Sequence, residues 1–387
     1  MAARAEGAPA VKTRPPWVDL LAGQLLALAG AFAFAGAIGS IIIIAYGQDP
    51  LFIYSTVWAF GTSRPQDFAL VLENATPLIF SGLAVAVAFK AGMFNIGVEG
   101  QYIVAMSAAA AAAVNLDSLP AIVLLPAVIL AAVLAGMAWA AVPAVLKVKT
   151  GAHEVVTTIM MNGIAISFVA WLILNPLHST GSQAADLRTD TFPKGALAPN
   201  LAQSLGLEDR IPDSVVHLTW LFPLSLIVCA GIWFLMFKTR LGYEVRALGS
   251  SSGSAEAGGI SIGATQIKIF LISGALAGLV GLNHILGDTG YLGSNYEAGL
   301  GFAGIAVAFL GRNHPAGIPL AAILLGILLR GQDGLAIVTD LPTEILIILQ
   351  GVLILSVVVA YELVNRALAR RQQRAVGLIE TPRKAEA

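Results

Sequence analysis

Long apolar runs recur along this chain and restrict what it can fold into. A helix needs about 20 predominantly apolar residues to cross a bilayer. Candidate runs lie near residues 20–45, 68–89, 93–114, 120–146, 154–175, 218–237, 266–286, 300–311, 315–330 and 344–362. Only 12% of the residues are charged, against about 25% in soluble domains. The sequence therefore predicts an all-α polytopic membrane protein with about ten transmembrane helices.

The lengths and positions of these apolar runs predict how the chain is divided into parts. The first run, 20–45, is longer than the roughly 7–15 apolar residues of a signal peptide, so we expect it to be a retained span. The runs 300–311 and 315–330 are short, and we expect broken or re-entrant segments there. The expected parts are a basic cytoplasmic tail over 1–19, a transmembrane domain over 20–365 and a second cytoplasmic tail over 366–387.

The positions of Lys and Arg predict the orientation. With the N-terminus inside and the runs alternating, all but five of the 22 Lys and Arg residues fall on the inner side. Basic residues concentrate in cytoplasmic loops, so both termini are expected in the cytoplasm. The outer exceptions are Arg64, Arg188, Lys194, Arg210 and Arg330.

Two loops are longer than a connection requires. The outer loop, 176–217, contains turn signals such as Ala198-Pro199-Asn200. One interpretation is a flexible surface loop. The other is a cap, or a docking surface for an external partner. The inner loop, 238–267, mixes charged and small residues and shows a short helix signal around 253–257. It is either a solvated connector or a rigid element that seats on another subunit.

Several chemistries are disfavoured by what the sequence lacks. The net charge of −1 gives no case for nucleic acid, and the single cysteine, Cys229, can form neither an intrachain disulfide nor a cysteine metal cluster. No GxxxxGK[ST] or HExxH motif occurs. The five histidines are scattered, and His284 with Asp288 forms an i, i+4 pair near a helix end. We therefore expect no catalytic residue, metal or cofactor, and no ATP hydrolysis by this chain.

Residues 89–104, FKAGMFNIGVEGQYIV, place polar side chains inside an apolar run. A charged side chain at mid-membrane costs about 2.5–3.5 kcal/mol on insertion scales. Glu99 is therefore expected to face a bundle interior or a watery cavity, or to be protonated. The glycines around it indicate a broken or closely packed segment. Glu99 either braces a neighbouring helix or, with Asn95 and Gln101, lines or supports a polar solute path.

A second polar, Gly-rich region covers residues 287–315 in the other half of the chain. Transporter halves are often inverted repeats with short, Gly-interrupted segments near the binding site. Residues 89–104 and 287–315 occupy comparable places in the two halves. Asn162 is more polar than helix packing requires. It either forms hydrogen bonds to a neighbouring helix or contacts the solute.

Four segments, in order along the chain, resemble one family. They are FNIGVEGQ over 94–101, HEVVTTIMMN over 153–162, LGYEVRALG continued to GGI over 241–260, and GIAVAFLGRNHP over 304–315. Together they are similar to the signatures of ABC importer permeases of the nucleoside and simple-sugar type, within the branched-chain amino acid/ribose permease superfamily. The resemblance covers residues from about 70 to 330.

The resemblance implies a transport subunit of the bacterial inner (plasma) membrane. Two permease chains, identical or paralogous, would form the path of a small polar solute such as a nucleoside or a ribose-like sugar. Cytoplasmic ABC ATPase subunits would bind to the cytoplasmic side of the permease, and an extracytoplasmic solute-binding protein would deliver solute to its outer side. We assign the solute path to Phe94, Asn95, Glu99, Gln101, Asn162 and Phe302. We assign coupling to the ATPase to Gly242, Glu244, Arg246, Ala247, Gly249, Ser254, Ala255 and Gly258.

The sequence departs from the family pattern at three places. His153 stands where Asn is common, Gly253-Ser254 replace a charged or Pro-Glu pair, and Ala303 stands where a polar residue is expected. These departures leave the predicted fold unchanged and leave the solute open.

Two other functional classes are alternatives. A secondary transporter driven by an ion gradient would use Glu99 as its proton or sodium site and would need no ATPase partner. An intramembrane enzyme would need a nucleophile and a base that converge within the spans, and we identify no such pair.

Overall fold

The computed structural model describes most of the middle of the chain. It covers residues 33–180, 185–211 and 216–339, with isolated positions at 30, 348, 351–352, 355–356 and 359. The chain divides into two units, Met1–Pro50 with Pro342–Ala387, and Leu51–Leu341. The described helix of the first unit covers Ala33–Ala45. The expected tails, 1–19 and 366–387, and most of the expected span 344–362 lie outside the described residues.

From Pro50 onward the described elements are helical, and no β-strand occurs among the residues that the structure describes. This confirms the predicted all-α class for that part of the chain. The elements are α2 (Pro50–Thr62), α3 (Pro65–Lys90), α4 (Val98–Asn115), α5 (Ala121–Thr150), α6 (Glu154–Leu174), η1 (Lys194–Ala196), α7 (Leu201–Ser204), α8 (Leu221–Lys238), α9 (Arg240–Ser250), α10 (Ser252–Ala257), α11 (Ile262–Ala277), η2 (His284–Thr289), α12 (Leu300–Leu310) and α13 (Ile318–Val338).

Five of these helices are long and apolar enough to cross a membrane, namely α3, α5, α6, α8 and α13. The number is six if the helix Ala33–Ala45 and α2 are taken as one broken span. Helix α2 was not predicted, because its 13 residues fall short of the about 20 that mark a span. The chain is therefore a multi-pass membrane protein, whereas ten spans with cytoplasmic termini remain a prediction.

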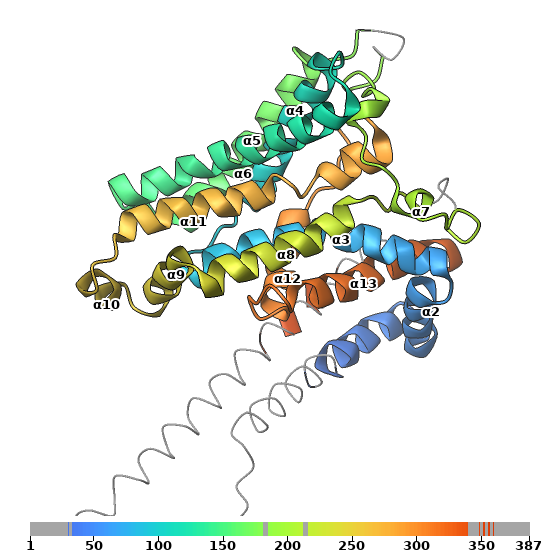
Figure 1. Ribbon diagram of the computed structural model, residues 1–387. Helices are drawn as coiled ribbons and strands as arrows, with labels where there is room; N and C mark the ends of the chain where they lie inside the picture. Colours follow the sequence, from blue (N-terminus) through green and yellow to red (C-terminus); the bar gives the residue numbers. More distant parts are fainter. Residues whose placement is uncertain are drawn as a thin grey trace, which may run out of the picture. The chain divides into compact units, whose positions relative to one another are not determined.

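Helix α3 forms the centre of the second unit. In its most apolar window 78% of the residues are buried, compared with 22% in α5 and 28% in both α6 and α8. Figure 1 shows α4, α5, α6 and α11 on one side of α3, and α12 and α13 on the other. The outer helices expose large apolar side chains such as Leu130, Ile166 and Ile227, as expected of surfaces that face lipid.

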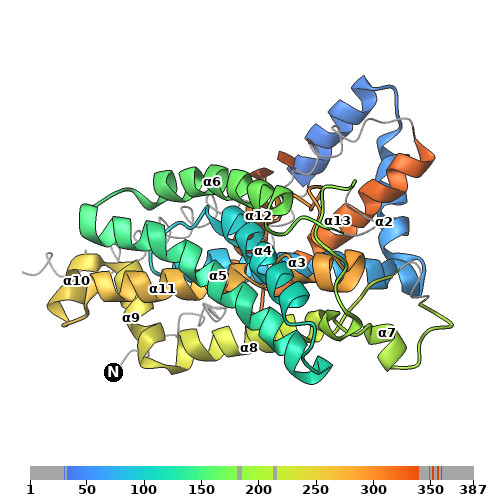
Figure 2. The same ribbon diagram turned by 90° about the horizontal axis from the view of Figure 1, so that it is seen from above.

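Small residues bring α5 and α11 into close contact, and the two helices lie side by side in Figure 2. A Cβ atom on Gly136 would overlap the Gly274 carbonyl, and a Cβ on Gly274 or Gly278 would meet the α5 backbone in return. Membrane helices approach each other this closely only where glycine or another small residue lies between them. The expected span 266–286 is not one helix, since α11 ends at Ala277 and the π-helix η2 follows.

The described part of the outer loop is packed on the segment that follows α11. Phe192 N donates to the Gly290 carbonyl at 2.8 Å, and Thr189 N donates to the Leu292 carbonyl at 2.9 Å. The Arg188 guanidinium lies 4.1 Å from the centre of the Tyr291 ring. These contacts favour a cap over a floppy loop. A role of this loop in docking stays a prediction.

Candidate functional site

Helix α12 begins in the middle of the membrane-spanning core rather than at its edge. The Ser81 hydroxyl donates to the Leu300 carbonyl at 2.8 Å. At a rise of 1.5 Å per residue, Ser81 lies about 24 Å from the first residue of α3 and about 14 Å from its last. The far end of α12 reaches the end of α3, where the Phe309 and Phe89 rings lie 5.1 Å apart. Its 11 residues measure about 16 Å, roughly half of a bilayer core.

Helix α4 starts at the same depth and runs the opposite way. The chain leaves α3 at Lys90, returns through the irregular segment 91–97 and enters α4 at Val98. Farther along, Met106 packs against Gly281, close to η2. Two helices from different halves of the chain thus begin next to each other inside the core, as the comparison of residues 89–104 and 287–315 suggested.

The carboxylate of Glu99 joins the two helix beginnings. Its Oε1 accepts a hydrogen bond from Gly299 N at 2.7 Å, and its Oε2 accepts one from Gly301 N at 2.8 Å. Glu99 itself belongs to the first turn of α4. Helix N-termini carry unpaired N–H groups and the positive end of the helix dipole, so a carboxylate is favoured there. The residue is 4% exposed, and both of its oxygens are bound within the chain.

The hydroxyl of Tyr102 adds to this junction. It lies 3.1 Å from Glu99 Oε1 and 2.8 Å from the Glu297 carbonyl oxygen. A phenol carries one proton, so Tyr102 donates to one of these acceptors at a time. The side chain is fully buried. It therefore links α4 to the irregular segment that precedes α12.

Asn95 and Gln101 form a paired amide cluster beside Glu99. The Asn95 amide nitrogen donates to Gln101 Oε1 at 3.0 Å and to Ser273 Oγ at 2.8 Å. The Asn95 oxygen accepts from Gln101 Nε2 at 3.1 Å and from Gly97 N at 3.0 Å. Both donors and both acceptor positions of Asn95 are thus used. Asn95 and Gln101 are each 1% exposed, so the cluster holds segment 91–97 against α11.

Asn162 holds the same segment from α6. Its Oδ1 accepts from Gly100 N at 2.9 Å, and its Nδ2 donates to the Ile96 carbonyl at 3.0 Å. A Cβ on Gly100 would overlap Asn162, which explains the glycine at that position. The structure thus brings Asn95, Glu99, Gln101 and Asn162 together around one break in the helices.

Phe94 and Phe302 are placed differently from these four residues. The Phe94 ring lies 6.1 Å from Phe89 and 6.3 Å from Phe309, at the end of α3. Phe302 is 51% exposed on α12, directly after Gly301. Neither ring makes a polar contact with the residues that the structure describes, and both are more open than the buried amides.

Sequence reasoning missed three further members of this junction: Ser81, Tyr102 and Ser273. Ser81 and Ser273 lie in the apolar second halves of α3 and α11, where nothing local marks a hydroxyl that bonds to another segment, and Tyr102 follows Gln101 on α4. The spacing of Gly301 and Gly304 was the available signal, because glycines three residues apart indicate a close approach. A Cβ on Gly304 would overlap the Ser81 hydroxyl.

The predicted inner element consists of two helices, α9 and α10. The short helix expected around 253–257 is present as α10, with Ser251 as its N-cap, and all of its residues except Ala255 are exposed. The Arg246 guanidinium on α9 donates to the Met236 carbonyl near the end of α8 and lies 5.4 Å from the Phe237 ring. A cation at a helix C-terminus is stabilising. Arg246 therefore ties α9 to α8.

The glycines of α9 allow a similarly close approach. A Cβ on Gly242 would overlap the carbonyls at the end of α8, and one on Gly249 would overlap the Lys90 carbonyl. The rest of the predicted coupling set varies in exposure, since Ala255 is buried and Ala247 is half-buried. Glu244 pairs with Arg240, and Ser254 and Gly258 are exposed.

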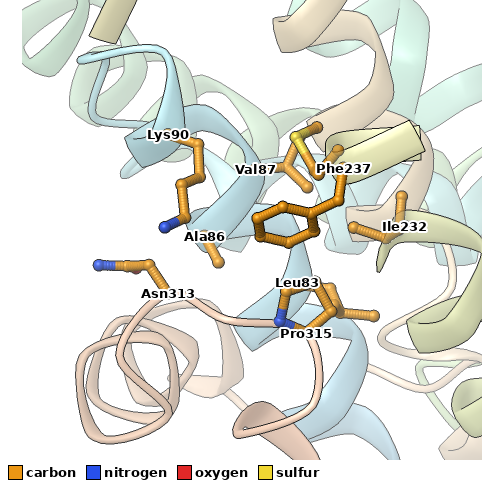
Figure 3. Close-up of a pocket in the computed structure, with 9 residues that line it drawn as sticks. Leu83, Ala86, Val87, Lys90, Ile232, Phe237, Asn313 and Pro315 are labelled. Atoms are coloured by element: carbon orange, nitrogen blue, oxygen red, sulfur yellow. The ribbon is translucent and has the colours of Figure 1, made fainter. Parts of the chain in front are cut away.

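A small cavity lies between α3, α8 and the turn that contains Asn313 and Pro315. Its volume is about 10 Å³, the room of roughly one water molecule. In Figure 3 the Phe237 ring lies at the centre of the lining, with Leu83 and Pro315 below it and Lys90 and Asn313 to the left. His314 lies 5.3 Å from the Phe237 ring. Partial burial, with Lys90 and Arg312 nearby, lowers the pKa of His314.

A cluster of charged side chains lies under the outer loop. Asp288 accepts from both sides, with Oδ1 at 3.4 Å from His217 Nδ1 and Oδ2 at 3.4 Å from His284 Nδ1. The hydrogen bond from His284 holds the pKa of Asp288 below its usual value. His217 N also donates to Glu73 Oε2 at 2.8 Å. In the described part of the chain, no group of three or more His, Cys, Asp or Glu side chains is arranged to hold a metal ion.

Comparison with known proteins agrees with this architecture. The family model of the branched-chain amino acid transport system / permease component matches residues 68–358. The chain is 33% identical to the glucose ABC transporter permease protein TsgB13 of Haloferax volcanii, over 89% of this chain and 88% of that protein. It is 34% identical to the guanosine ABC transporter permease protein NupP of Bacillus subtilis, over 84% and 90%.

A third relative extends this set. The nucleoside ABC transporter permease protein NupB of Lactococcus lactis is 29% identical over 86% of this chain and 90% of that protein. No solved structure matches the chain significantly. The relatives are permease components, so this chain is a transport subunit of the inner membrane rather than an enzyme, and ATP hydrolysis belongs to a separate subunit. The chain belongs to the family of branched-chain amino acid transport system permease components.

Proposed function

We propose that this chain is the membrane-spanning subunit of an ATP-driven importer for a small, neutral, hydroxyl-rich solute, either a nucleoside or a ribose-like sugar. The observation that carries this proposal is the identity of 33–34% to the permeases named for glucose and guanosine, over most of each chain. Both named solutes are uncharged and rich in hydroxyl groups. A path for such a solute needs hydrogen-bonding groups and aromatic faces rather than a fixed counter-charge.

The junction around Glu99 supports a transporter built on broken helices. Discontinuous helices place irregular backbone at membrane depth, where it survives only beside protein or a water-filled cavity. On this proposal Asn95, Gln101 and Asn162 support the passage by holding its wall together. Phe94 and Phe302 are the members of the predicted set that are open enough to meet solute.

The inner helices α9 and α10 form the proposed coupling element. Arg246, Gly242 and Gly249 fix α9 against α8 and the end of α3, while α10 projects as an exposed helix. A rigid, exposed helix can seat in a groove of another subunit and transmit its motion. We propose that the ATPase binds here, with Glu244, Ala247, Ser254, Ala255 and Gly258 completing the element.

The remaining partners follow from the same proposal. A second permease chain, identical or paralogous, completes the path, and an extracytoplasmic binding protein docks on the outer loop. The full topology would have ten spans and both termini in the cytoplasm.

The alternative is a secondary transporter with Glu99 as its ion site. Both carboxylate oxygens of Glu99 accept backbone hydrogen bonds at 2.7–2.8 Å, so a cation would have to displace the caps of α12. This arrangement favours the importer.

The two functions differ in their energy source. The chain would be produced with its ATPase, binding protein and partner permease, and uptake of radiolabelled guanosine, ribose and glucose would be measured in membrane vesicles. The importer predicts uptake that requires ATP and persists with an uncoupler. Uptake that continues without the ATPase and collapses with the uncoupler would establish the secondary transporter instead.

A further inference from the structure

The segment between η2 and α12 descends from the outer side into the core without secondary structure. Its upper part is held by the outer loop, since Leu292 N donates to Thr189 Oγ1 at 3.1 Å and Ser294 N donates to the Leu187 carbonyl at 3.1 Å. Its lower end is Gly299, which donates to Glu99. The residues between these anchors are Asn295, Tyr296, Glu297 and Ala298.

Most of these residues leave their backbone donors unpaired. Residues 294–295 form a turn that Tyr296 closes, and within the described part of the chain no hydrogen bond is made by the N–H groups of Asn295, Glu297 and Ala298. The side chains of Asn295 and Glu297 likewise make no hydrogen bond or ion pair there. Asn295, Glu297 and Ala298 are exposed, and Tyr296 is half-buried.

The depth of the segment excludes lipid as its neighbour. Gly299 directly precedes Leu300, which Ser81 fixes about 24 Å below the outer end of α3. An unpaired backbone group in hydrocarbon costs several kcal/mol, and several within one short segment would be prohibitive. The open side of residues 295–298 must therefore meet water, solute or another polar surface.

We propose that residues 295–298, together with Phe302, form the solute-contacting wall of the passage, with Asn295 and Glu297 as its specificity-determining side chains. This inference rests on the proposed function and deepens it. The unpaired N–H groups donate to solute oxygens, and the Glu297 carboxylate accepts from two adjacent hydroxyls of a ribose-like ring. The Phe302 ring, which is 51% exposed, offers a face for a nucleobase or the apolar face of a sugar.

This wall differs in kind from the buried junction beside it. The polar side-chain atoms of Asn95, Glu99 and Gln101 are hydrogen-bonded within the chain. The side-chain polar atoms of Asn295 and Glu297 make no such bond among the described residues, and only the backbone on either side of these two residues is anchored. Glu297 is connected to the junction through its carbonyl, which lies 2.8 Å from the Tyr102 hydroxyl. Its carboxylate therefore projects from a segment fixed at both ends.

Cysteine accessibility in the assembled complex tests the proposal. Cys229 is the single native cysteine and is buried, so a Cys229→Ala chain is a suitable background. Asn295→Cys and Phe302→Cys would be treated with a positively charged, water-soluble methanethiosulfonate reagent. Ile166→Cys is the matched control, because Ile166 is exposed on α6 near the middle of that helix and faces the expected lipid.

The expected result is labelling of Asn295→Cys at least about tenfold faster than Ile166→Cys, because thiols surrounded by hydrocarbon form little thiolate. Millimolar guanosine or ribose should slow labelling at Asn295→Cys and Phe302→Cys. In vesicles, Glu297→Gln should weaken uptake of the preferred solute more than Glu297→Asp does.

Slow labelling at both positions would overturn the proposal and would indicate that a second permease chain covers this face. Labelling that neither solute slows, in a complex that still transports that solute, would overturn it as well. The labelling rate, and its slowing by solute, can be measured whatever energy source drives uptake. If uptake proves to be ATP-independent, the proposed importer fails, while solute protection still reports on this wall.

Discussion

Glu99 and Gly301 are joined across about two hundred residues of sequence by a 2.8 Å hydrogen bond from the Gly301 N–H to Glu99 Oε2. The bond places an anion at the beginning of α12 while Glu99 itself occupies the first turn of α4. One carboxylate thus stabilises two helix N-termini at a depth where water is scarce. This relationship explains why a charged residue stands inside an apolar run.

Replacing Glu99 tests how much this junction contributes to stability. Glu99→Gln keeps the shape but turns one acceptor oxygen into a donor facing an N–H, and Glu99→Ala removes both acceptors. Hydrogen bonds to charged groups contribute about 1.5–3 kcal/mol each, so we expect a loss of about 2–4 kcal/mol for Glu99→Ala and less for Glu99→Gln. The measurement is thermal unfolding of the purified protein in detergent. Unchanged stability combined with lost uptake would instead indicate that Glu99 meets solute.

Gly304→Ala tests the packing of α12 on α3. The new Cβ would overlap the Ser81 hydroxyl, and overpacking of a close contact costs about 1–3 kcal/mol. Gly231→Ala on α8 is the control, because a Cβ there meets nothing within 4 Å and alanine favours a helix over glycine. Thermal unfolding should show a lower midpoint for Gly304→Ala alone. An equal response of the two variants would contradict the close approach of α12 and α3.

The sequence predicted the class of the molecule and the location of its polar break more securely than the roles of single residues. Long apolar runs require a membrane, and they matched α3, α5, α6 and α8 closely because each of these helices contains a long apolar stretch with few charged residues. The sequence predicts a broken or re-entrant segment at 300–311, and this run is the 11-residue helix α12. The same expectation for 315–330 is wrong, because that run belongs to α13, which has 21 residues and is long enough to cross. The depth at which α12 begins could not be predicted, because it is defined by Glu99, a partner about two hundred residues away.

The hydrogen-bond partners of the buried polar residues could not be predicted from the sequence, and the reason is physical. Asn95 and Gln101 satisfy each other and Ser273, which depends on how α11 packs against segment 91–97. No local pattern distinguishes such a pair from residues that line a path. The open residues Asn295 and Glu297 were overlooked because polar residues in a loop look ordinary until the depth of that loop is known.

Arg246→Ala should separate α9 from α8. The substitution removes the hydrogen bond to the Met236 carbonyl and the contact with the Phe237 ring, so we expect a loss of about 1–3 kcal/mol and a lower rate of ATP-driven uptake. Arg240→Ala is the control, since Arg240 is an exposed partner of Glu244 and such pairs contribute about 0–1 kcal/mol. Uptake and thermal unfolding would be measured for both variants. Normal uptake in Arg246→Ala would rule out α9 as a coupling element.

Acid should loosen the outer loop through Asp288. The carboxylate links His217 at the end of that loop to His284 on η2, and its folded-state pKa lies below the ordinary value of 3.8. A depressed carboxylate pKa contributes stability that is present above the unfolded-state value and is lost as the pH falls through the folded-state value. We therefore expect the loop to stay closed at neutral pH and to open below about pH 4. Asp288→Asn should open it already at neutral pH.

Limited proteolysis of outward-facing vesicles measures this opening, because Lys194 and Arg210 within the loop are trypsin sites that can be cut after a brief acid pulse. Asp186→Asn is the matched control, since Asp186 pairs with Arg188 within the loop itself and does not reach η2. Cleavage of Asp288→Asn at neutral pH should be faster than that of the unchanged chain, while Asp186→Asn should resemble it. If all three chains are cut at one rate at every pH, the loop is held by its backbone hydrogen bonds to residues 286–294 and not by the carboxylate.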